Sequence, residues 1–264
     1  MIILKQFMKN LLNRLKRKRE PNMDTIKIDS FETKMIAHRG LSGIEKENTC
    51  PAFVAAGNRS YYGIETDVHV TKDGKIVVIH DDTTKRVTGG NIDLTVEEVN
   101  YSDLENIVLP DTDGSTNRQD IRIPLLKDYI GICKKYNKIC VLEIKNHFAV
   151  SDLEKVINEV YNYNYLNSMI FISFDLDNCI NLRKLLPNAK IQYLLAKDIT
   201  DDVIDTLVLN NLDLDVQYTR LNKDIINKLH DKGILVNCWT CDDKEKAEEL
   251  VSMGVDFITT NILE

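Results

Sequence analysis

The segment 62–82 constrains the fold more than any other part of the chain, because it combines a regular strand pattern with clustered acids. Its first half alternates with a period of two, which is characteristic of a β-strand, and places Glu65 and Asp67 on one face. An Asp-Gly turn and an apolar run follow, so a hairpin is expected to return His80 toward the carboxylates. Positions two apart on a strand lie roughly 6.6 Å from each other, so both acids can reach one ion. Solvated acids on an exposed strand edge are the alternative interpretation.

Strand and helix patterns alternate along the rest of the chain. Expected strands occupy residues 34–37, 62–70, 139–144, 169–173, 190–195, 214–217, 234–239 and 257–259. Eight such units in 264 residues favour an α/β fold of the (β/α)₈ TIM barrel class, with the eighth helix absent or very short. A doubly wound sheet is the alternative, but no glycine-rich phosphate loop follows the first strand. The helix after strand 139–144 is expected to begin at a capping box formed by Ser151 and Glu154.

The chain is predicted to contain one barrel domain, residues 24–264, preceded by a basic amphipathic segment, residues 1–23. Polar, turn-rich sequence interrupts the barrel pattern after the second strand, and we interpret residues 71–124 as a small insertion. The first twenty residues carry seven Lys or Arg and one Glu, with apolar residues at helical spacing. Such a segment can lie on an anionic membrane surface, pack against the domain or remain without fixed structure. Its apolar stretch is too broken for a transmembrane span or a signal peptide.

Charge and cysteine content narrow the class of protein. The formal net charge is −7 despite the basic first twenty residues, which argues against a nucleic-acid-binding body. Six cysteines are scattered without a disulfide pattern, so we expect a reduced, cytoplasmic protein, with association at the inner membrane surface if the basic segment binds lipid. Cys238 and Cys241 have the spacing of a redox pair, but their place beside a late strand favours packing.

Polar residues gather where barrel strands are expected to end, and the active sites of such barrels lie at those ends. They are His38, Arg39, Glu65, Asp67, Glu143, Lys145, Ser173, Gln217 and Trp239. Glu143 and Lys145 stand two apart in an apolar strand, so both are expected to point inward, although a structural salt bridge is the alternative. Three carboxylates form an all-oxygen ligand set, which favours Mg²⁺ or Ca²⁺ over zinc.

This combination suits hydrolysis of a phosphate diester. A bound metal and Arg39 would stabilise charge that builds on the phosphoryl group. His38 and His80 titrate near neutral pH and can supply the base for the attacking group and the acid for the leaving group. The sequence does not assign the two roles between them. The other histidines, His69, His147 and His230, are interpreted as structural or surface residues.

Nine short segments stand in an order that is highly specific. They are HRG (38–40), ENT (47–49), AF (52–53), ETDVHVTKDGKIVVIHD (65–81), LTVEEV (94–99), IPLL (123–126), EIK (143–145), SF (173–174) and WT (239–240). Together they resemble the glycerophosphodiester phosphodiesterase family over nearly all of residues 35–260. The resemblance implies a (β/α)₈ barrel with a small insertion after the second strand. It also implies metal-dependent hydrolysis of glycerophosphodiesters to sn-glycerol 3-phosphate and an alcohol, in glycerophospholipid breakdown.

The resemblance further implies a role for each matched position. His38 and His80 look like the acid–base pair, Glu65, Asp67 and Glu143 like ligands of one Mg²⁺ or Ca²⁺, Arg39 and Lys145 like phosphate contacts, and Phe174 and Trp239 like walls for the glycerol or head group. In this family the substrate's own glycerol hydroxyl can attack first and give a cyclic phosphate, a route that these residues allow. Lysophospholipase D-like hydrolysis of lysophospholipids at the membrane surface is the alternative activity. A catalytically silent phosphodiester-binding barrel is disfavoured, because every expected residue is present.

Two segments depart from the usual sequence of the family. Trp-Thr is followed by Cys241-Asp242 rather than Val-Asn, and the last strand ends Thr259-Thr260-Asn261 rather than Thr-Asp with a proline soon after. We expect neither departure to touch a catalytic position, so the departures should affect substrate preference rather than activity.

Overall fold

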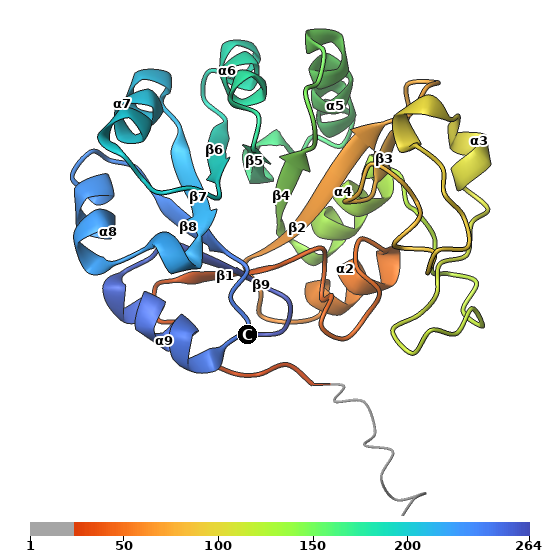
Figure 1. Cartoon of the computed structure of the whole chain (residues 1–264), viewed down its shortest axis with the longest axis horizontal. Coiled ribbons are helices and arrows are strands. Elements are labelled where there is room, and N and C mark those ends of the chain that lie inside the picture. Colours follow the sequence, from red (N-terminus) through yellow and green to blue (C-terminus); the bar gives the residue numbers. More distant parts are fainter. Residues whose placement is uncertain (1–23) are drawn as a thin grey trace, which may run out of the picture.

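A computed structural model describes residues 24–264 of the chain, and its centre is a closed barrel of eight parallel strands (Figure 1). The strands are β1 (Lys34–Ala37), β2 (Gly63–Val70), β4 (Ile139–Ile144), β5 (Met169–Ser173), β6 (Lys190–Leu195), β7 (Asp213–Gln217), β8 (Val236–Trp239) and β9 (Phe257–Thr260). The barrel closes because β1 pairs in parallel with both β2 and β9. The predicted (β/α)₈ class is confirmed.

Helices surround the barrel and cover the outer face of its strands (Figure 1). They are α2 (Cys50–Gly57), α4 (Leu126–Tyr136), α5 (Val150–Asn162), α6 (Leu176–Leu185), α7 (Asp201–Asn210), α8 (Lys223–His230) and α9 (Lys244–Met253). Within residues 24–264 no helix follows β9, as the sequence predicted for the eighth unit. None of the helices in this range is both long and apolar enough to span a bilayer.

Alternation along the strands separates an outer core from an inner one. On β2, Ile64 and Val68 belong to the large core that packs against the helices. A smaller cluster lies on the opposite, inward faces of the strands and consists of Ile36, Val141, Ile170, Ile172, Leu194 and Phe257. Glu65 and Asp67 alternate with the outward residues of β2, so their side chains are directed to the barrel interior.

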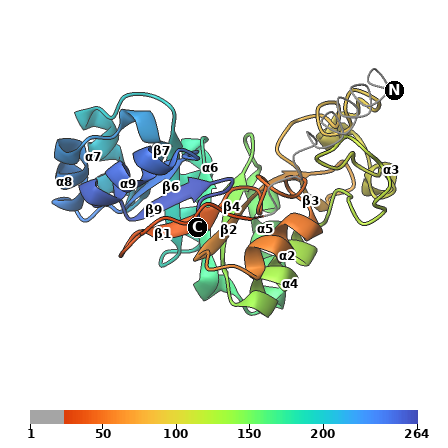
Figure 2. The ribbon, with the colours of Figure 1, turned by 90° about the horizontal axis from the view of Figure 1, so that it is seen from below.

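The insertion is built on the hairpin that follows β2. Strand β3 (Ile76–Val78) pairs antiparallel with the end of β2, and the 3₁₀ turn η1 (Val96–Glu98) and helix α3 (Tyr101–Leu104) come after it. Figure 2 shows this part lying beside the barrel, at the opposite end from α7 and α8. Although the sequence is polar, it forms a core of its own: Val77, Ile79, Val87, Val96, Leu104, Ile107, Leu109, Ile121 and Ile123.

The predicted capping box at the start of α5 is wrong. The helix begins one residue before Ser151, and its N-cap is Ala149, which accepts main-chain hydrogen bonds from Asp152 and Leu153. The preceding Phe148 is buried, and its main-chain N–H is bonded to the Asn178 side chain. These contacts fix the start of the helix, so a tertiary constraint overrides the local signal of the Ser and Glu pair.

Residues 1–23 lie outside the described part of the chain. The predicted basic amphipathic segment falls within them, so its contact with a membrane stays a prediction.

The Glu264 side chain connects the first described residues to the loop that precedes β2. Its carboxylate accepts hydrogen bonds from Thr25 Oγ1 at 2.6 Å and from the Ser60 main-chain N–H at 2.6 Å, and lies 2.8 Å from Lys27 Nζ. Burial alone would raise its pKa, but the Lys27 ammonium and these hydrogen bonds outweigh burial and lower the pKa to about 2.

We expect Glu264→Gln to lower the free energy of unfolding at pH 7 by about 2 kcal/mol, the usual scale for hydrogen bonds to a charged group. A pKa depressed in the folded state stabilises the fold above the ordinary carboxyl pKa and loses that effect as pH falls toward the folded value. The difference between variant and native protein should therefore shrink as pH falls from about 4.5 toward 2. Urea unfolding at several pH values measures it, and a difference that stays constant would contradict the account.

Candidate active site

Three carboxylates from two neighbouring strands converge inside the mouth of the barrel. Glu65 and Asp67 come from β2 and Glu143 from β4, and each offers an oxygen within 4.8 Å of the others. The register explains their meeting, since Asp67 and Glu143 stand directly opposite each other in the parallel pair. All three are buried, and Asp67 Oδ1 receives no hydrogen bond from the described residues. The arrangement could hold a metal ion.

Burial and mutual repulsion act on these acids together. Burial raises the pKa of Glu65 well above its ordinary value, and the charges of Asp67 and Glu143 raise it further. The pKa of Glu143 is raised for the same reasons, burial first and Asp67 second. Asp67 is buried as well, but the neighbouring cations Arg39 and Lys145 lower its pKa. The cluster therefore carries more negative charge than its protein surroundings stabilise.

The turn after β1 brings His38 and Arg39 to this cluster. His38 Nε2 lies 4.0 Å from Glu65 Oε2. Arg39 has a left-handed backbone with φ of 53°, and its main-chain N–H donates to Glu65 Oε2 at 2.7 Å. The Arg39 guanidinium lies 3.5 Å from Asp67 Oδ2. An L-residue with a side chain seldom adopts this φ, so the contacts to the acids hold a strained backbone in place.

His80 is held by a series of charged contacts that crosses the site. Its Nδ1 lies 2.6 Å from Asp81 Oδ1, and because a carboxylate only accepts, the ring donates this N–H. Arg86, from the insertion, donates Nε to Asp81 Oδ2 at 2.6 Å and Nη1 to Glu47 Oε2 at 2.8 Å. Glu47 also accepts from Arg39 Nη1 at 2.9 Å. Arg86 thus joins the partner of His80 to the partner of Arg39.

Both imidazoles have a lowered pKa. Burial is the main cause at His38, followed by the charge of Arg39. Burial is also the main cause at His80, while the charge of Asp67 acts in the opposite direction. Both rings are therefore neutral at neutral pH in the protein without ligands, and each can accept a proton there.

Lys145 and Asn48 complete the surroundings of the acids. Lys145 Nζ donates to Glu143 Oε1 at 2.8 Å and lies 3.7 Å from Asp67 Oδ1. Asn48 donates its Nδ2 to Asp67 Oδ2 at 2.8 Å and accepts from Thr66 Oγ1 at 2.7 Å. These contacts fix the orientation of Asp67, and Lys145 offsets part of the acidic charge.

The family model of the glycerophosphoryl diester phosphodiesterase family matches residues 38–264. The chain belongs to this family. A glycerophosphodiester phosphodiesterase from Caldanaerobacter subterraneus subsp. tengcongensis is 31% identical over 88% of this chain and 95% of its own. A human protein named lysophospholipase D is 34% identical over 52% of this chain and 44% of its own. Among solved structures, a glycerophosphodiester phosphodiesterase from Parabacteroides distasonis superposes with a TM-score of 0.73 at 28% identity, covering 87% of this chain and 93% of that one.

Membership confirms the predicted enzyme class, a glycerophosphodiester phosphodiesterase, and the structure brings most of the predicted site residues together. His38, Arg39, Glu65, Asp67, Glu143 and Lys145 share direct contacts. Three predicted residues remain. His80 follows β3 and interacts with the charge of Asp67. Phe174 and Trp239 lie at the ends of β5 and β8, where they pack edge to face with ring centroids 5.5 Å apart. Phe174 is 46% exposed, so this aromatic pair presents an apolar surface to solvent.

His69 and the surface histidines lie where the sequence interpretation put them. His69 is fully buried, with Nε2 3.2 Å from the main-chain oxygen of His80 and Nδ1 3.1 Å from Glu97. Its contact with the main chain of His80 stabilises the hairpin that carries His80. His230 lies on the outer surface in α8, where its Nε2 is 2.8 Å from Asp256.

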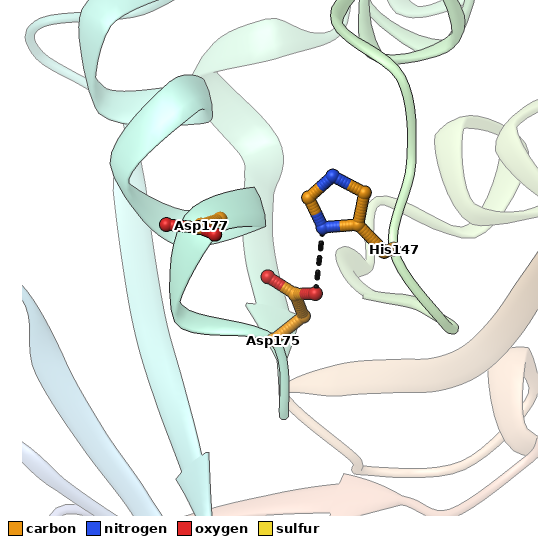
Figure 3. A group of neighbouring side chains, drawn as sticks. All are labelled: His147, Asp175 and Asp177. Atoms are coloured by element: carbon orange, nitrogen blue, oxygen red, sulfur yellow. Dashed lines mark hydrogen bonds and ion pairs between the residues drawn. The ribbon is translucent and has the colours of Figure 1, made fainter.

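A second group of possible ligands consists of His147 on the loop after β4, Asp175 at the N-cap of α6 and Asp177 in the first turn of α6. Figure 3 shows the His147 ring above Asp175, with Nδ1 at 2.9 Å from Oδ2. His147 is largely exposed, and Asp175 already caps α6 by accepting from the main-chain N–H of Asn178. These local contacts account for the group without a ligand.

Sequence reasoning assigned no role to five residues that contact the site or its partners: Glu47, Asn48, Asp81, Arg86 and Asn261. Two of them, Glu47 and Asn48, stand in the ENT segment, which was a usable signal. The expectation that Asn261 lies away from the catalytic positions is wrong, because its side-chain oxygen is 2.8 Å from His38 Nδ1.

We expect Arg86→Ala to lower kcat by about tenfold or more, since residues that orient catalytic groups usually contribute 10- to 100-fold. The change removes the shared partner of Asp81 and Glu47 and so loosens both His80 and Arg39. Lys85→Ala is the matched control, because Lys85 stands in the same loop and, among residues 24–264, its side chain forms an exposed ion pair with Asp93. Equal kcat values in the two variants would show that Arg86 has no special role.

Proposed function

We propose that the chain hydrolyses glycerophosphodiesters to sn-glycerol 3-phosphate and an alcohol, as a step in glycerophospholipid breakdown. The observation that carries the proposal is the convergence of Glu65, Asp67 and Glu143 beside the His38 imidazole and two cations. The His80 imidazole lies near enough to interact with the charge of Asp67. We propose that the three carboxylates hold one divalent cation, Mg²⁺ or Ca²⁺.

The donor set fits a hard cation. All three ligands are carboxylate oxygens, which Mg²⁺ and Ca²⁺ prefer, and the geometry has no thiolate or imidazole inside the group. The raised pKa of Glu65 and Glu143 marks an excess of buried negative charge. Asp67 Oδ1 receives no hydrogen bond from residues 24–264, which leaves it ready to accept a ligand. A bound divalent cation would supply Lewis-acid stabilisation of the phosphoryl oxygens.

Arg39 and Lys145 are suited to bind and orient the phosphate. Each lies at the edge of the acidic cluster, Arg39 beside Asp67 and Lys145 beside Glu143. A guanidinium and an ammonium in a partly buried site stabilise the negative charge that grows on phosphate oxygens as the P–O bond breaks.

His38 and His80 would perform the two proton transfers. Each ring donates its Nδ1–H to a protein oxygen, so each Nε2 is left for the substrate. One Nε2 takes the proton of the attacking hydroxyl or water. The other ring must first take up a proton on its Nε2 and, as an imidazolium, delivers that proton to the leaving alkoxide. The attacking group is either the glycerol hydroxyl of the substrate, giving a cyclic phosphate, or water. Phe174 and Trp239 would then cover the glycerol or the head group with their apolar faces.

Hydrolysis of lysophospholipids is a second candidate activity, which the similarity to the human protein named lysophospholipase D favours. This reaction would use the same proton transfers, but its substrate carries an acyl chain that a glycerophosphodiester lacks. The exposed aromatic ring of Phe174 offers an apolar surface for that chain.

One assay tests these proposals. We expect glycerol 3-phosphate release from glycerophosphocholine or glycerophosphoethanolamine in Mg²⁺ or Ca²⁺, and loss of activity in EDTA that added metal restores. His38→Ala and His80→Ala should each lower kcat by about 10²- to 10⁴-fold, the usual contribution of a general acid or base. Parallel measurement of head-group release from lysophospholipids separates the two candidate substrates.

The surface variant His230→Gln is the control for the histidine changes, because His230 lies on the outer surface in α8 and, in the described part of the chain, its ring pairs with Asp256. Activity that survives EDTA would refute the metal proposal. A loss under about tenfold at both His38 and His80 would remove them from the chemistry.

A further inference from the structure

We propose that Asp242 and Asn261 form a positioning pair for His38, in which the Asp242 carboxylate orients the Asn261 amide so that its oxygen holds the Nδ1–H of His38. The inference rests on the proposed function in one respect: it takes His38 as one of the two residues that transfer a proton in the reaction. It concerns the two segments at which the chain departs from its family's usual sequence, which the sequence had led us to associate with substrate preference.

The contact between His38 and Asn261 fixes which ring nitrogen faces the site. Asn261 Oδ1 lies 2.8 Å from His38 Nδ1, on the side of the ring away from Glu65. An amide oxygen only accepts a hydrogen bond, so the neutral imidazole must carry its proton on Nδ1. Its Nε2 then bears a lone pair and points toward the carboxylate cluster, which is the form a proton acceptor needs.

This argument depends on the amide presenting its oxygen and not its nitrogen, and Asp242 decides that point. Asn261 Nδ2 donates to Asp242 Oδ2 at 2.5 Å, and the Asn261 main-chain N–H donates to Asp242 Oδ1 at 2.7 Å. A carboxylate accepts only, so the side of the amide that faces Asp242 must be the NH₂ group. The oxygen is thereby turned to His38.

Neighbouring hydroxyl groups hold the same arrangement. Thr260 Oγ1 donates to Asp242 Oδ1 at 2.8 Å and so fixes the carboxylate. The Ser42 hydroxyl lies 2.7 Å from Asn261 Oδ1 and also 2.7 Å from the main-chain oxygen of His38. The hydroxyl has a single proton and can also accept a hydrogen bond, so Ser42 holds the amide in place, whereas Asp242 decides which way the amide faces.

The barrel brings the three residues together. His38 directly follows β1, Asn261 directly follows β9, and Asp242 lies three residues after the end of β8. These strands are neighbours in the sheet, in the order β1, β9, β8. The ends of three adjacent parallel strands therefore supply the ring, the amide and the carboxylate at one rim.

The two histidines are held in different ways. The partner of His80 is the carboxylate of Asp81, whereas the partner of His38 is a neutral amide with the carboxylate one hydrogen bond further away. Asp242 thus acts on His38 through the orientation of Asn261 and makes no direct contact with the ring in the described part of the chain.

Three variants of the full chain test the pair, and a fourth serves as the control. Asn261→Leu removes the amide at similar volume, and Asp242→Asn keeps the shape but removes the charge that orients it. We expect each to lower kcat by about 10- to 100-fold with little change in KM, as for groups that orient a catalytic residue. The exchange variant Asp242→Asn/Asn261→Asp again sets a carboxylate against an amide and should recover to within about threefold of native kcat.

Asp243→Asn is the matched control. Asp243 stands next to Asp242 but caps α9 by accepting from the main-chain N–H of Lys246, a role that Asn fills equally well. Its kcat should equal that of the native chain. A comparable loss in this control, native kcat in Asn261→Leu and Asp242→Asn, or an exchange variant no better than the single variants would each overturn the proposal.

Nitrogen NMR of the imidazoles gives a readout that does not depend on activity. In the native chain without substrate, the His38 resonances, identified by their loss in His38→Gln, should be those of a ring protonated on Nδ1. In Asn261→Leu the proton should redistribute toward Nε2, and circular dichroism should confirm that the variant is folded. A native His38 protonated on Nε2 would refute the pair. His38→Ala with native activity would instead refute the proposed function, and the NMR result would still decide the pair.

Discussion

Repulsion among three buried carboxylates is the constraint to which the rest of the site responds. Burial raises the cost of charge on Glu65, Asp67 and Glu143, and the raised pKa values of Glu65 and Glu143 show that this cost is not fully offset at these two residues. Arg39, Lys145 and Asn48 offset part of this cost through ion pairs and hydrogen bonds. The protein groups do not offset all of it, and a divalent cation among the three oxygens would supply the remainder.

The barrel produces this gathering through register, and the insertion stabilises it from one side. The direct pairing of β2 with β4 sets Asp67 opposite Glu143, although seventy-odd residues of chain separate them. Those intervening residues leave the barrel, form their own core and return Arg86 to the site. The insertion thus positions His80 and Arg39 at once, through Asp81 and Glu47.

Much of this was predictable from the sequence, because strand alternation and helix periodicity are local. The bounds of β1, β4, β5 and β6 agree with the sequence patterns, and Glu65 and Asp67 lie on the inward face that alternation required. The capping box at Ser151 failed because packing of Phe148 and its hydrogen bond to Asn178 set the start of α5. The contacts of Asn261 and Arg86 could not be predicted, since they join residues that are far apart in sequence and depend on side-chain direction.

The most direct test of the central claim is to locate a bound cation. Crystals grown with Mn²⁺, a substitute for Mg²⁺ with strong anomalous scattering, should show one anomalous peak within coordination distance of Glu65, Asp67 and Glu143. The same peak should vanish in crystals of Glu143→Gln. A peak at His147, Asp175 and Asp177 instead, or none at the three buried carboxylates at saturating Mn²⁺, would contradict the account.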